Sequence, residues 1–369
     1  MYDVKWQYKP VLFLIDYIGS VLFFWLKLKR TPRAPRRILV IRLDHIGDMI
    51  MTTPVFANLK RAYPRAALTV LCRTLTAEIL RHNPHVNCIE SIEPPWWKRT
   101  DHSGWLRMLQ TVLSLRRKRF DLVIELHADP RNIILARLIG GYVLGYGIRG
   151  FGFLLNEVAS YRPQHSIDRN NALLNAFGIA TPVRTTTFYL RQRDHQAAQK
   201  LIAKFHLKDF IIVNPGTGRS EKEWVHWKQL CHEFRGYQIV LTGSGADQAV
   251  CDRISEQCNT VNLCGKTSIR QLAALVKRAR LVIAPDTGII HISHAMGTPL
   301  VALFGPTLPQ LWGYQSKTEI SISACRWCPV CHTMKCVRED HRMECMNRIG
   351  VKTVARAARR LLENPERTQ

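Results

Sequence analysis

The sequence alternates apolar, β-branched runs with amphipathic segments, and it does so in two successive blocks. In the first block, apolar runs at 37–43, 66–72 and 120–126 are separated by helical patterns. A second block of the same kind starts near residue 208. Continuous apolar runs are typical of strands that are buried on both faces of a parallel sheet, with helices covering those faces. The pattern therefore predicts two α/β units with parallel sheets, joined by a hinge within 180–207.

Length and composition fit two folded domains. The chain has 369 residues, of which 46% are hydrophobic and 22% charged, and this excludes a disordered basic chain. Lys and Arg total 53 against 28 Asp and Glu, which gives a net charge of +25. A charge this large favours an anionic partner, such as nucleic acid, an anionic membrane or an acidic small molecule.

An apolar run at 11–26 precedes a basic segment near the N-terminus. Asp16 and Ser20 are its clearly polar members, and residues 27–37 carry six basic residues and no acidic one. The run is shorter than the ~20 residues that span a bilayer, and the basic block lies on the wrong side for a signal peptide. We expect residues 1–35 to form a membrane-associated helix and basic stem on an anionic membrane surface. A helix packed on the protein itself and a true single span are the alternatives.

The chain has 11 cysteines, an odd number in a long sequence, which argues against a secreted disulfide scaffold and favours a reduced, cytoplasmic setting. Five of them form a cluster with the spacing C-x₂-C-x₂-C-x₄-C-x₈-C: Cys325, Cys328, Cys331, Cys336 and Cys345. Thiolates this close could hold a structural Zn²⁺. Plain thiols, reduced or variably oxidised, and another site such as an Fe–S cluster are the alternatives.

In each block, one polar loop follows the first strand. Ligands bind at this position in open α/β sheets. In the first block, Gly47 allows a ligand to approach closely, and Asp48 begins a helix expected to run to Pro64. Asp48 is either a helix cap or a general base. In the second block, small residues at 214–218 precede Lys222. They make a plausible phosphate cradle without Walker A spacing, and an ordinary turn is the alternative.

Two further loops in the second block carry the same kind of signal. The Gly-rich turn at 243–247 ends in Asp247, which can contact a ribose or base, or can be only a turn. Asp286 opens a D-T-G turn, and His291 lies one helical turn further on. Successive N–H groups at a helix start favour a diphosphate. A G-x-G-x-x-G match at 145–150 lies too late in its block to be a dinucleotide fingerprint.

Four segments in order resemble glycosyltransferase family 9, the ADP-heptose:lipopolysaccharide heptosyltransferases. They are "ILVIRLDHIGDMIMTTPVFANLKRAYP", "VNPGTGRSEKEWVHWKQL", "IVLTGSGADQ" and "LVIAPDTGIIHISHAMGTPLVALFGPT", and the resemblance covers residues 36–350. It implies the GT-B architecture, with two Rossmann-like domains facing across a cleft. The acceptor-side domain would be 36–185, and the nucleotide-sugar-binding domain 186–350, with the Cys-rich insertion at 325–345. Residues 351–369 would form a C-terminal helix that can pack on the N-terminal domain.

The resemblance also implies an activity and its residues. The reaction is inverting transfer of a heptose or related sugar from an ADP-sugar to lipopolysaccharide core or a similar glycolipid, at the cytoplasmic face of the bacterial inner membrane. Asp48 matches the general base, and Arg42 and Gly47 match acceptor-binding positions. The positions that match donor-binding residues are Thr217, Gly218, Lys222, Asp247, Thr267, Asp286, Thr287, Gly288 and His291. Asp247 stands where the family commonly has Glu. No cofactor is required in this design, apart from the possible structural Zn.

Two other functions are carried as alternatives. One is a different sugar-nucleotide enzyme on the same fold, such as an epimerase. The other is a basic membrane- or nucleic-acid-binding protein without catalysis. No nucleic-acid partner is expected, because the basic residues concentrate in the N-terminal stem and at 116–119, without an aromatic-interleaved recognition motif.

Overall fold

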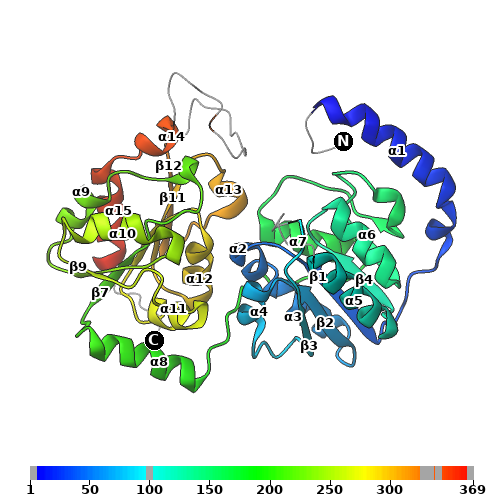
Figure 1. Ribbon diagram of the computed structural model, residues 1–369, viewed down its shortest axis with the longest axis horizontal. Helices are drawn as coiled ribbons and strands as arrows, with labels where there is room; N and C mark the ends of the chain where they lie inside the picture. Colours follow the sequence, from blue (N-terminus) through cyan, green and yellow to red (C-terminus); the bar gives the residue numbers. More distant parts are fainter. Residues whose placement is uncertain (1–5, 97–102, 325–335, 337–342, 364–369) are drawn as a thin grey trace. The chain divides into compact units, whose positions relative to one another are not determined.

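The chain forms two compact units, Met1–Thr186 (unit 1) and Thr187–Gln369 (unit 2). The structure is a computed structural model, and it describes residues 6–96, 103–324, 336 and 343–363. Each unit contains a six-stranded sheet whose strand pairs are all parallel. Helices cover both faces of each sheet (Figure 1). The expected α/β class with two parallel sheets is therefore confirmed.

The two sheets share one strand order. In unit 1 the order is β3-β2-β1-β4-β5-β6, and in unit 2 it is β9-β8-β7-β10-β11-β12 when read from the same side. This is the doubly wound Rossmann order 3-2-1-4-5-6, which reverses direction beside the first strand and binds ligands at the carboxyl ends there. The strands are β1 Arg37–Arg42, β2 Ala67–Cys72, β3 Cys88–Ser91, β4 Leu122–Glu125, β5 Tyr142–Gly145, β6 Glu157–Val158, β7 Phe210–Val213, β8 Gln238–Leu241, β9 Thr260–Asn262, β10 Val282–Pro285, β11 Leu300–Phe304 and β12 Glu319–Ser323.

Helices connect the strands as crossovers. The helices of unit 1 are α1 Lys9–Leu22, α2 Ile46–Ile50, α3 Thr53–Ala62, α4 Thr74–Leu80, α5 Ser103–Arg117, α6 Pro130–Ile139 and α7 Ser166–Ala176. Those of unit 2 are α8 Gln192–Lys204, α9 Trp227–Glu233, α10 Gln248–Ser255, α11 Ile269–Val276, α12 Gly288–Met296, α13 Pro309–Trp312, α14 Glu344–Asn347 and α15 Val351–Glu363. Short 3₁₀ turns are η1 Trp6–Tyr8, η2 Phe24–Leu28, η3 Gly152–Leu154, η4 Ser220–Lys222 and η5 Gly245–Asp247.

The helix expected from Asp48 to Pro64 is interrupted. It consists of α2 and α3, with Pro54 in the first turn of α3. Proline cannot donate to the preceding turn, and it disfavours the helical conformation of the residue before it. The Thr53 hydroxyl instead donates to the Ile50 carbonyl at 2.7 Å. The break ends α2 at Ile50, and the helix begins at Ile46, a short loop after the end of β1.

Each unit has its own hydrophobic core. The core of unit 1 includes Leu39 and Val123 from the sheet. In unit 2, Trp224 is fully buried, and its indole N–H donates to the Ile349 carbonyl at 2.9 Å. The apolar face of α15 joins this second core through Val354, Ala355, Ala358 and Leu361. This face of α15 therefore packs within unit 2, and contact of the C-terminal helix with the N-terminal domain stays a prediction.

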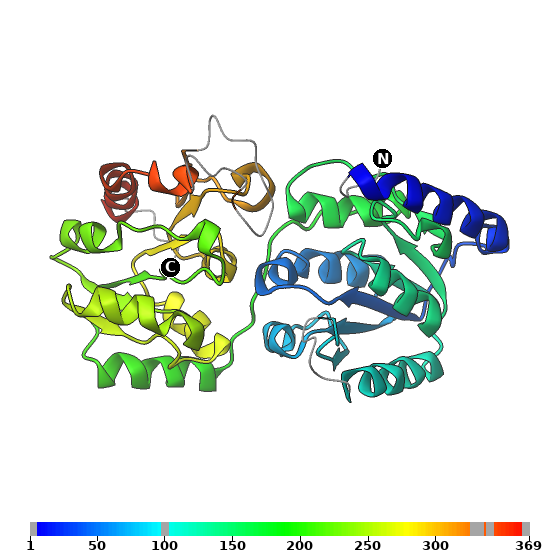
Figure 2. The ribbon, with the colours of Figure 1, turned by 45° about the horizontal axis from the view of Figure 1, so that its top comes forward.

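The N-terminal helix α1 is shorter than a membrane span. Among the residues that the structure describes, no helix combines the length and apolar character needed to cross a bilayer. Figure 2 shows α1, in dark blue, along the outside of unit 1.

Candidate active site

The first cluster of functional side chains lies where β1 ends. Arg42 is the last residue of β1 and is only 2% exposed. Its Nη1 donates to the Leu126 carbonyl at 2.8 Å, and its Nη2 donates to Oδ1 of Asp48 at 3.0 Å. Its Nε lies 3.2 Å from Oδ2 of Asp44. A buried guanidinium needs such partners, because an unpaired buried charge is costly.

Asp48 combines a fixed position with access to solvent. It lies in the first turn of α2, where a negative charge is favourable, and its side chain is 16% exposed. Gly47 precedes it and is buried in the same turn. The three residues predicted for the acceptor side, Arg42, Gly47 and Asp48, are therefore close together in unit 1.

Asp44 and His127 extend this cluster, and neither was predicted from the sequence. Nδ1 of His127, after β4, lies 2.8 Å from Oδ1 of Asp44. Burial acts to raise the pKa of Asp44, but Arg42 and His127 outweigh it and hold that pKa below its usual range. Burial acts to lower the pKa of His127, but the hydrogen bond to Asp44 outweighs it and raises that pKa. When the ring is neutral with its proton on Nδ1, Nε2 can accept from Arg149 Nη1 at 3.3 Å.

Glu125, the last residue of β4, is a fully buried carboxyl that sequence reasoning also missed. It accepts hydrogen bonds from the backbone N–H groups of His127 at 3.0 Å and Ala128 at 2.7 Å, and from Asn132 Nδ2 at 3.2 Å. Burial outweighs these bonds and raises the pKa of Glu125 to about 7. The signal in the sequence that could have identified Glu125 is an acidic residue at the end of an apolar strand.

The second cluster lies in unit 2, at the ends of β7 and β10. Lys222 Nζ lies 2.5 Å from Oδ2 of Asp286 and donates to the Asp286 carbonyl at 2.9 Å. The Thr307 hydroxyl, in the loop after β11, donates to the same carboxylate oxygen at 2.6 Å. Burial acts to raise the pKa of Asp286, but Lys222 and Thr307 outweigh it and lower that pKa. Thr307 was not predicted from the sequence.

The loops after β7 and β8 contact each other through Asp247. Its Oδ2 accepts from the backbone N–H of Ser244 at 2.8 Å and from the Ser244 hydroxyl at 2.6 Å. A Cβ on Gly216 would lie 2.1 to 2.5 Å from the Asp247 carboxylate, so this contact requires glycine. In the same loop, Gly218 has φ +61°, and the Thr217 hydroxyl donates to the Arg219 carbonyl at 2.5 Å. Two loops predicted for the donor are therefore packed together.

The remaining predicted donor residues belong to two other loops of unit 2. Thr267 lies in the β9–α11 turn and is partly buried. Thr287 is the N-cap residue of α12, and Gly288 is its first residue. His291 is buried on α12, and its Nδ1 lies 2.8 Å from the Tyr314 hydroxyl. Tyr314 also stacks on His294, whose Nδ1 lies 2.6 Å from Glu319.

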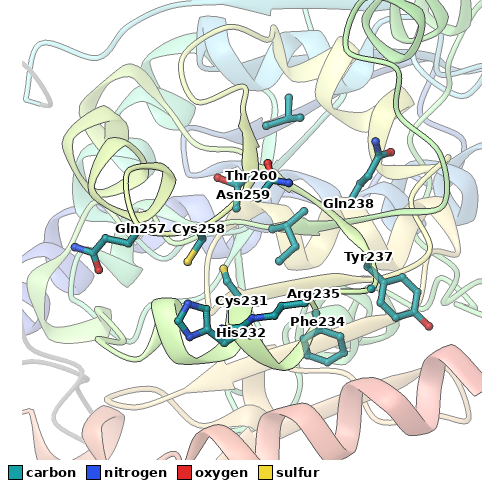
Figure 3. Close-up of a pocket in the computed structure, with 13 residues that line it drawn as sticks. Cys231, His232, Phe234, Arg235, Tyr237, Gln238, Gln257, Cys258, Asn259 and Thr260 are labelled. Carbon is teal, nitrogen blue, oxygen red and sulfur yellow. The ribbon is translucent and has the colours of Figure 1, made fainter.

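A separate cavity of about 560 Å³ lies at the opposite end of the unit 2 sheet, where β8 and β9 begin (Figure 3). Its walls come from the ends of α9 and α10 and include Cys231 and Cys258. Burial raises the pKa of the Cys231 thiol to about 12, so the thiol is not an activated nucleophile. None of the predicted site residues lines this cavity.

The predicted zinc site is a cluster of five cysteines between residues 325 and 345. Cys325, Cys328 and Cys331 lie outside the described residues, whereas Cys336 and Cys345 lie within them. Within the described part of the chain, no three His, Cys, Asp or Glu residues are grouped as a metal site would require. Structural zinc stays a prediction.

Comparison with known proteins identifies the family. Residues 108–342, more than half of the chain, match glycosyltransferase family 9 (heptosyltransferase). A relative from Escherichia coli strain K12, "Lipopolysaccharide heptosyltransferase 3", is 31% identical over 286 residues, which cover 72% of this chain and 81% of the relative. The chain belongs to glycosyltransferase family 9. It is therefore a glycosyltransferase, and the resemblance drawn from its four loop segments is confirmed.

Two solved family 9 structures confirm the fold. One is the glycosyl transferase family 9 protein from Veillonella parvula DSM 2008, with a TM-score of 0.79, 24% identity, and coverage of 89% of this chain and 97% of that one. The other is E. coli ADP-heptose lps heptosyltransferase II, with a TM-score of 0.71, 23% identity, and coverage of 88% and 98%. At these identities the likeness establishes the GT-B fold of family 9 and not the substrate.

Proposed function

We propose that this family 9 glycosyltransferase moves a heptose, or a closely related sugar, from an ADP-sugar to lipopolysaccharide core or a similar glycolipid. The proposal draws on the names of its relatives, a lipopolysaccharide heptosyltransferase and an ADP-heptose heptosyltransferase. It also draws on the two clusters of polar side chains at the carboxyl ends of the central strands, the usual ligand sites of this fold.

The unit 2 cluster would bind the donor. The start of α12 at Thr287 and Gly288 offers backbone N–H groups to a diphosphate, and Lys222 lies against Asp286 immediately before this turn. Lys222 would offset the charge that develops on the leaving diphosphate. Thr217 and Gly218, in the loop after β7, would complete the phosphate cradle. Asp247 and Thr267, in the loops after β8 and β9, would contact the nucleoside, and His291 would face the diphosphate–sugar region.

The unit 1 cluster would bind the acceptor and supply the base. Asp48 would accept the proton of the acceptor hydroxyl as its oxygen attacks the anomeric carbon of the donor. The bond from that carbon to the diphosphate breaks, and the nucleoside diphosphate leaves with the electron pair, which inverts the anomeric centre. The observation that carries this assignment is the hydrogen bond from Arg42 to Asp48, because it orients a carboxylate that is still solvent-accessible. Arg42 is then a positioning residue.

The cellular location of the enzyme follows from the class of its acceptor. A lipopolysaccharide-type acceptor places the enzyme at the cytoplasmic face of the bacterial inner membrane, on an anionic surface. The domain assignment is an acceptor-side domain at 36–185 and a donor-side domain at 186–350. In this proposal the transfer needs no cofactor, and zinc in the Cys-rich segment at 325–345 would be structural only. Metal analysis of the purified protein tests the zinc prediction.

The decisive test is a donor screen by titration calorimetry with ADP-heptose and with UDP-, GDP- and CMP-sugars. We expect selective binding of ADP-heptose, followed by its acceptor-dependent consumption with release of ADP. Selective binding of another nucleotide sugar would overturn the donor assignment. Conversion of the sugar without an acceptor would instead indicate an epimerase-like reaction.

A further inference from the structure

The N-terminal segment attaches to unit 1 along a narrow seam. Leu12, Asp16, Gly19, Phe23 and Leu26 recur at intervals of three or four residues and so share one helical face. Oδ1 of Asp16 accepts from the backbone N–H of Phe151 at 2.7 Å. A Cβ on Gly19 would lie 2.5 Å from the Phe153 ring, so the absence of a side chain allows this close packing. The seam joins α1 to the loop around η3.

Polar bonds at the end of the segment hold it further. Lys27, in η2, donates from Nζ to the Leu155 carbonyl at 2.7 Å. Asn156 Nδ2 donates to the Leu26 carbonyl at 2.6 Å. The segment is thus anchored along its length, and its outward face has a defined direction relative to unit 1.

The outward face of this segment is almost entirely apolar. Eleven large hydrophobic side chains are between 36% and 72% exposed: Val11, Phe13, Leu14, Ile15, Tyr17, Ile18, Val21, Leu22, Phe24, Trp25 and Leu28. An ordinary surface helix packs its apolar stripe on the core and turns polar residues to water. Here the buried seam includes a carboxylate and a glycine, and the apolar residues point outward. This inversion calls for a large apolar partner.

The flanking charge indicates the kind of partner. Lys29, Arg30, Arg33, Arg36 and Arg37 follow the apolar segment, and all five are exposed. Between Asp16 and Asp44 the sequence has no acidic residue. An apolar face beside a purely cationic stem complements a bilayer with anionic headgroups, and aromatic residues such as Tyr17 and Trp25 are favoured at that interface.

We propose that α1 lies in the plane of an anionic lipid bilayer, with this outward face in the headgroup and acyl boundary and its seam on unit 1. A 14-residue helix is about 21 Å long and too short for the ~30 Å hydrocarbon core. The seam to unit 1 also favours a surface orientation over insertion. This orientation rests on the membrane setting of the proposed function and names the lipid surface that α1 contacts. Its test measures membrane binding and not sugar transfer, so the membrane proposal and the proposed function can fail separately.

The test is co-sedimentation of the full chain with vesicles of phosphatidylethanolamine and phosphatidylglycerol, and with vesicles of phosphatidylcholine alone. We expect binding to the anionic vesicles, and at least a tenfold loss of partitioning in Leu14→Ser/Ile18→Ser, because two exposed apolar side chains of the outward face are replaced by polar ones. Val225→Ser, an equally exposed apolar side chain in unit 2, is the control and should bind as the wild type does.

A charge variant tests the lipid assignment independently. Arg30→Gln/Arg33→Gln alters only exposed side chains, so it should fold and bind anionic vesicles more weakly, with a smaller loss on raising salt. Undiminished binding by both double variants would overturn the proposal. A second outcome would also overturn it: the wild-type protein forms dimers in sedimentation velocity without vesicles, and Leu14→Ser/Ile18→Ser abolishes them. The outward face would then be the contact surface for a second copy of the chain.

Discussion

Lys222 places its ammonium 2.5 Å from the carboxylate of Asp286, although 64 residues separate the two in the sequence. Lys222 ends the η4 turn after β7, and Asp286 follows β10, the next strand in the sheet. The pair thus ties the two central strand ends of unit 2 together immediately before α12. A diphosphate that binds at this turn would contact a lysine that the buried Asp286 already orients.

Replacing Lys222 with alanine should weaken donor binding at least tenfold, because a charge-assisted contact to the diphosphate is lost. It should also destabilise unit 2 by about 1–3 kcal/mol, since Asp286 stays buried without its cation. Calorimetric titration and urea unfolding measure the two effects. Lys266→Ala, an exposed lysine of the same unit, is the control. An unchanged donor affinity in Lys222→Ala would place the diphosphate elsewhere.

Asp48→Asn should lower turnover by about 10²–10⁴-fold, the range typical of a lost general base. The amide retains a similar shape and can still accept from Arg42, so folding and donor affinity should remain near those of the wild type. Steady-state kinetics and donor titration together check this separation. Turnover at the wild-type level would remove Asp48 as the base.

Gly216→Ala should disturb the nucleoside side of the donor site. Its new Cβ would collide with the Asp247 carboxylate, which must then leave its hydrogen bonds to Ser244. We expect weaker donor binding and a loss of about 0.5–2 kcal/mol of stability, as for a broken helix cap. At Gly245 an added Cβ meets no atom within 4 Å, so Gly245→Ala is the matched control. Equal behaviour of the two variants would show that the contact is unimportant.

The His127–Asp44 pair predicts a pH dependence of stability. The folded protein raises the pKa of His127, so the pair's contribution is full below the unfolded value of about 6.5 and declines as pH rises through the folded value. The free energy of unfolding should therefore exceed that of His127→Gln by more at pH about 6 than at pH about 9. Urea unfolding at both values provides the measurement, with the exposed His232→Gln as control. A pH-independent difference would contradict the assignment.

Local sequence patterns predicted those features that depend on neighbouring residues. The strand at 37–43 and the loop to Asp48 lie within one βα unit, so Arg42 and Asp48 could be grouped from sequence alone. Glu125 and His127 reach the same place only because β4 pairs with β1, with Glu125 opposite Ile41. That pairing brings together residues about 80 positions apart, and apolar periodicity does not specify it.

The same limit explains the other differences. Thr307 meets Asp286 through pairing of β10 with β11, which no local motif encodes. The break between α2 and α3 was readable from Pro54, but the apolar pattern on both sides of it favoured one helix. The outward face of α1 could not be assigned from the sequence, because the run is apolar on nearly every side. Only the contacts of Asp16 and Gly19 identify the seam.

The separate cores of the two units have a calorimetric consequence. Each core is built from residues of one unit, around Val123 in unit 1 and around Trp224 in unit 2. A ligand stabilises the cooperative part of a protein that binds it, by an amount that grows with the logarithm of its concentration. A saturating nucleotide should therefore shift one of two heat-absorption peaks and leave the other near its original temperature. The shifted peak would reveal which half of the chain holds the donor.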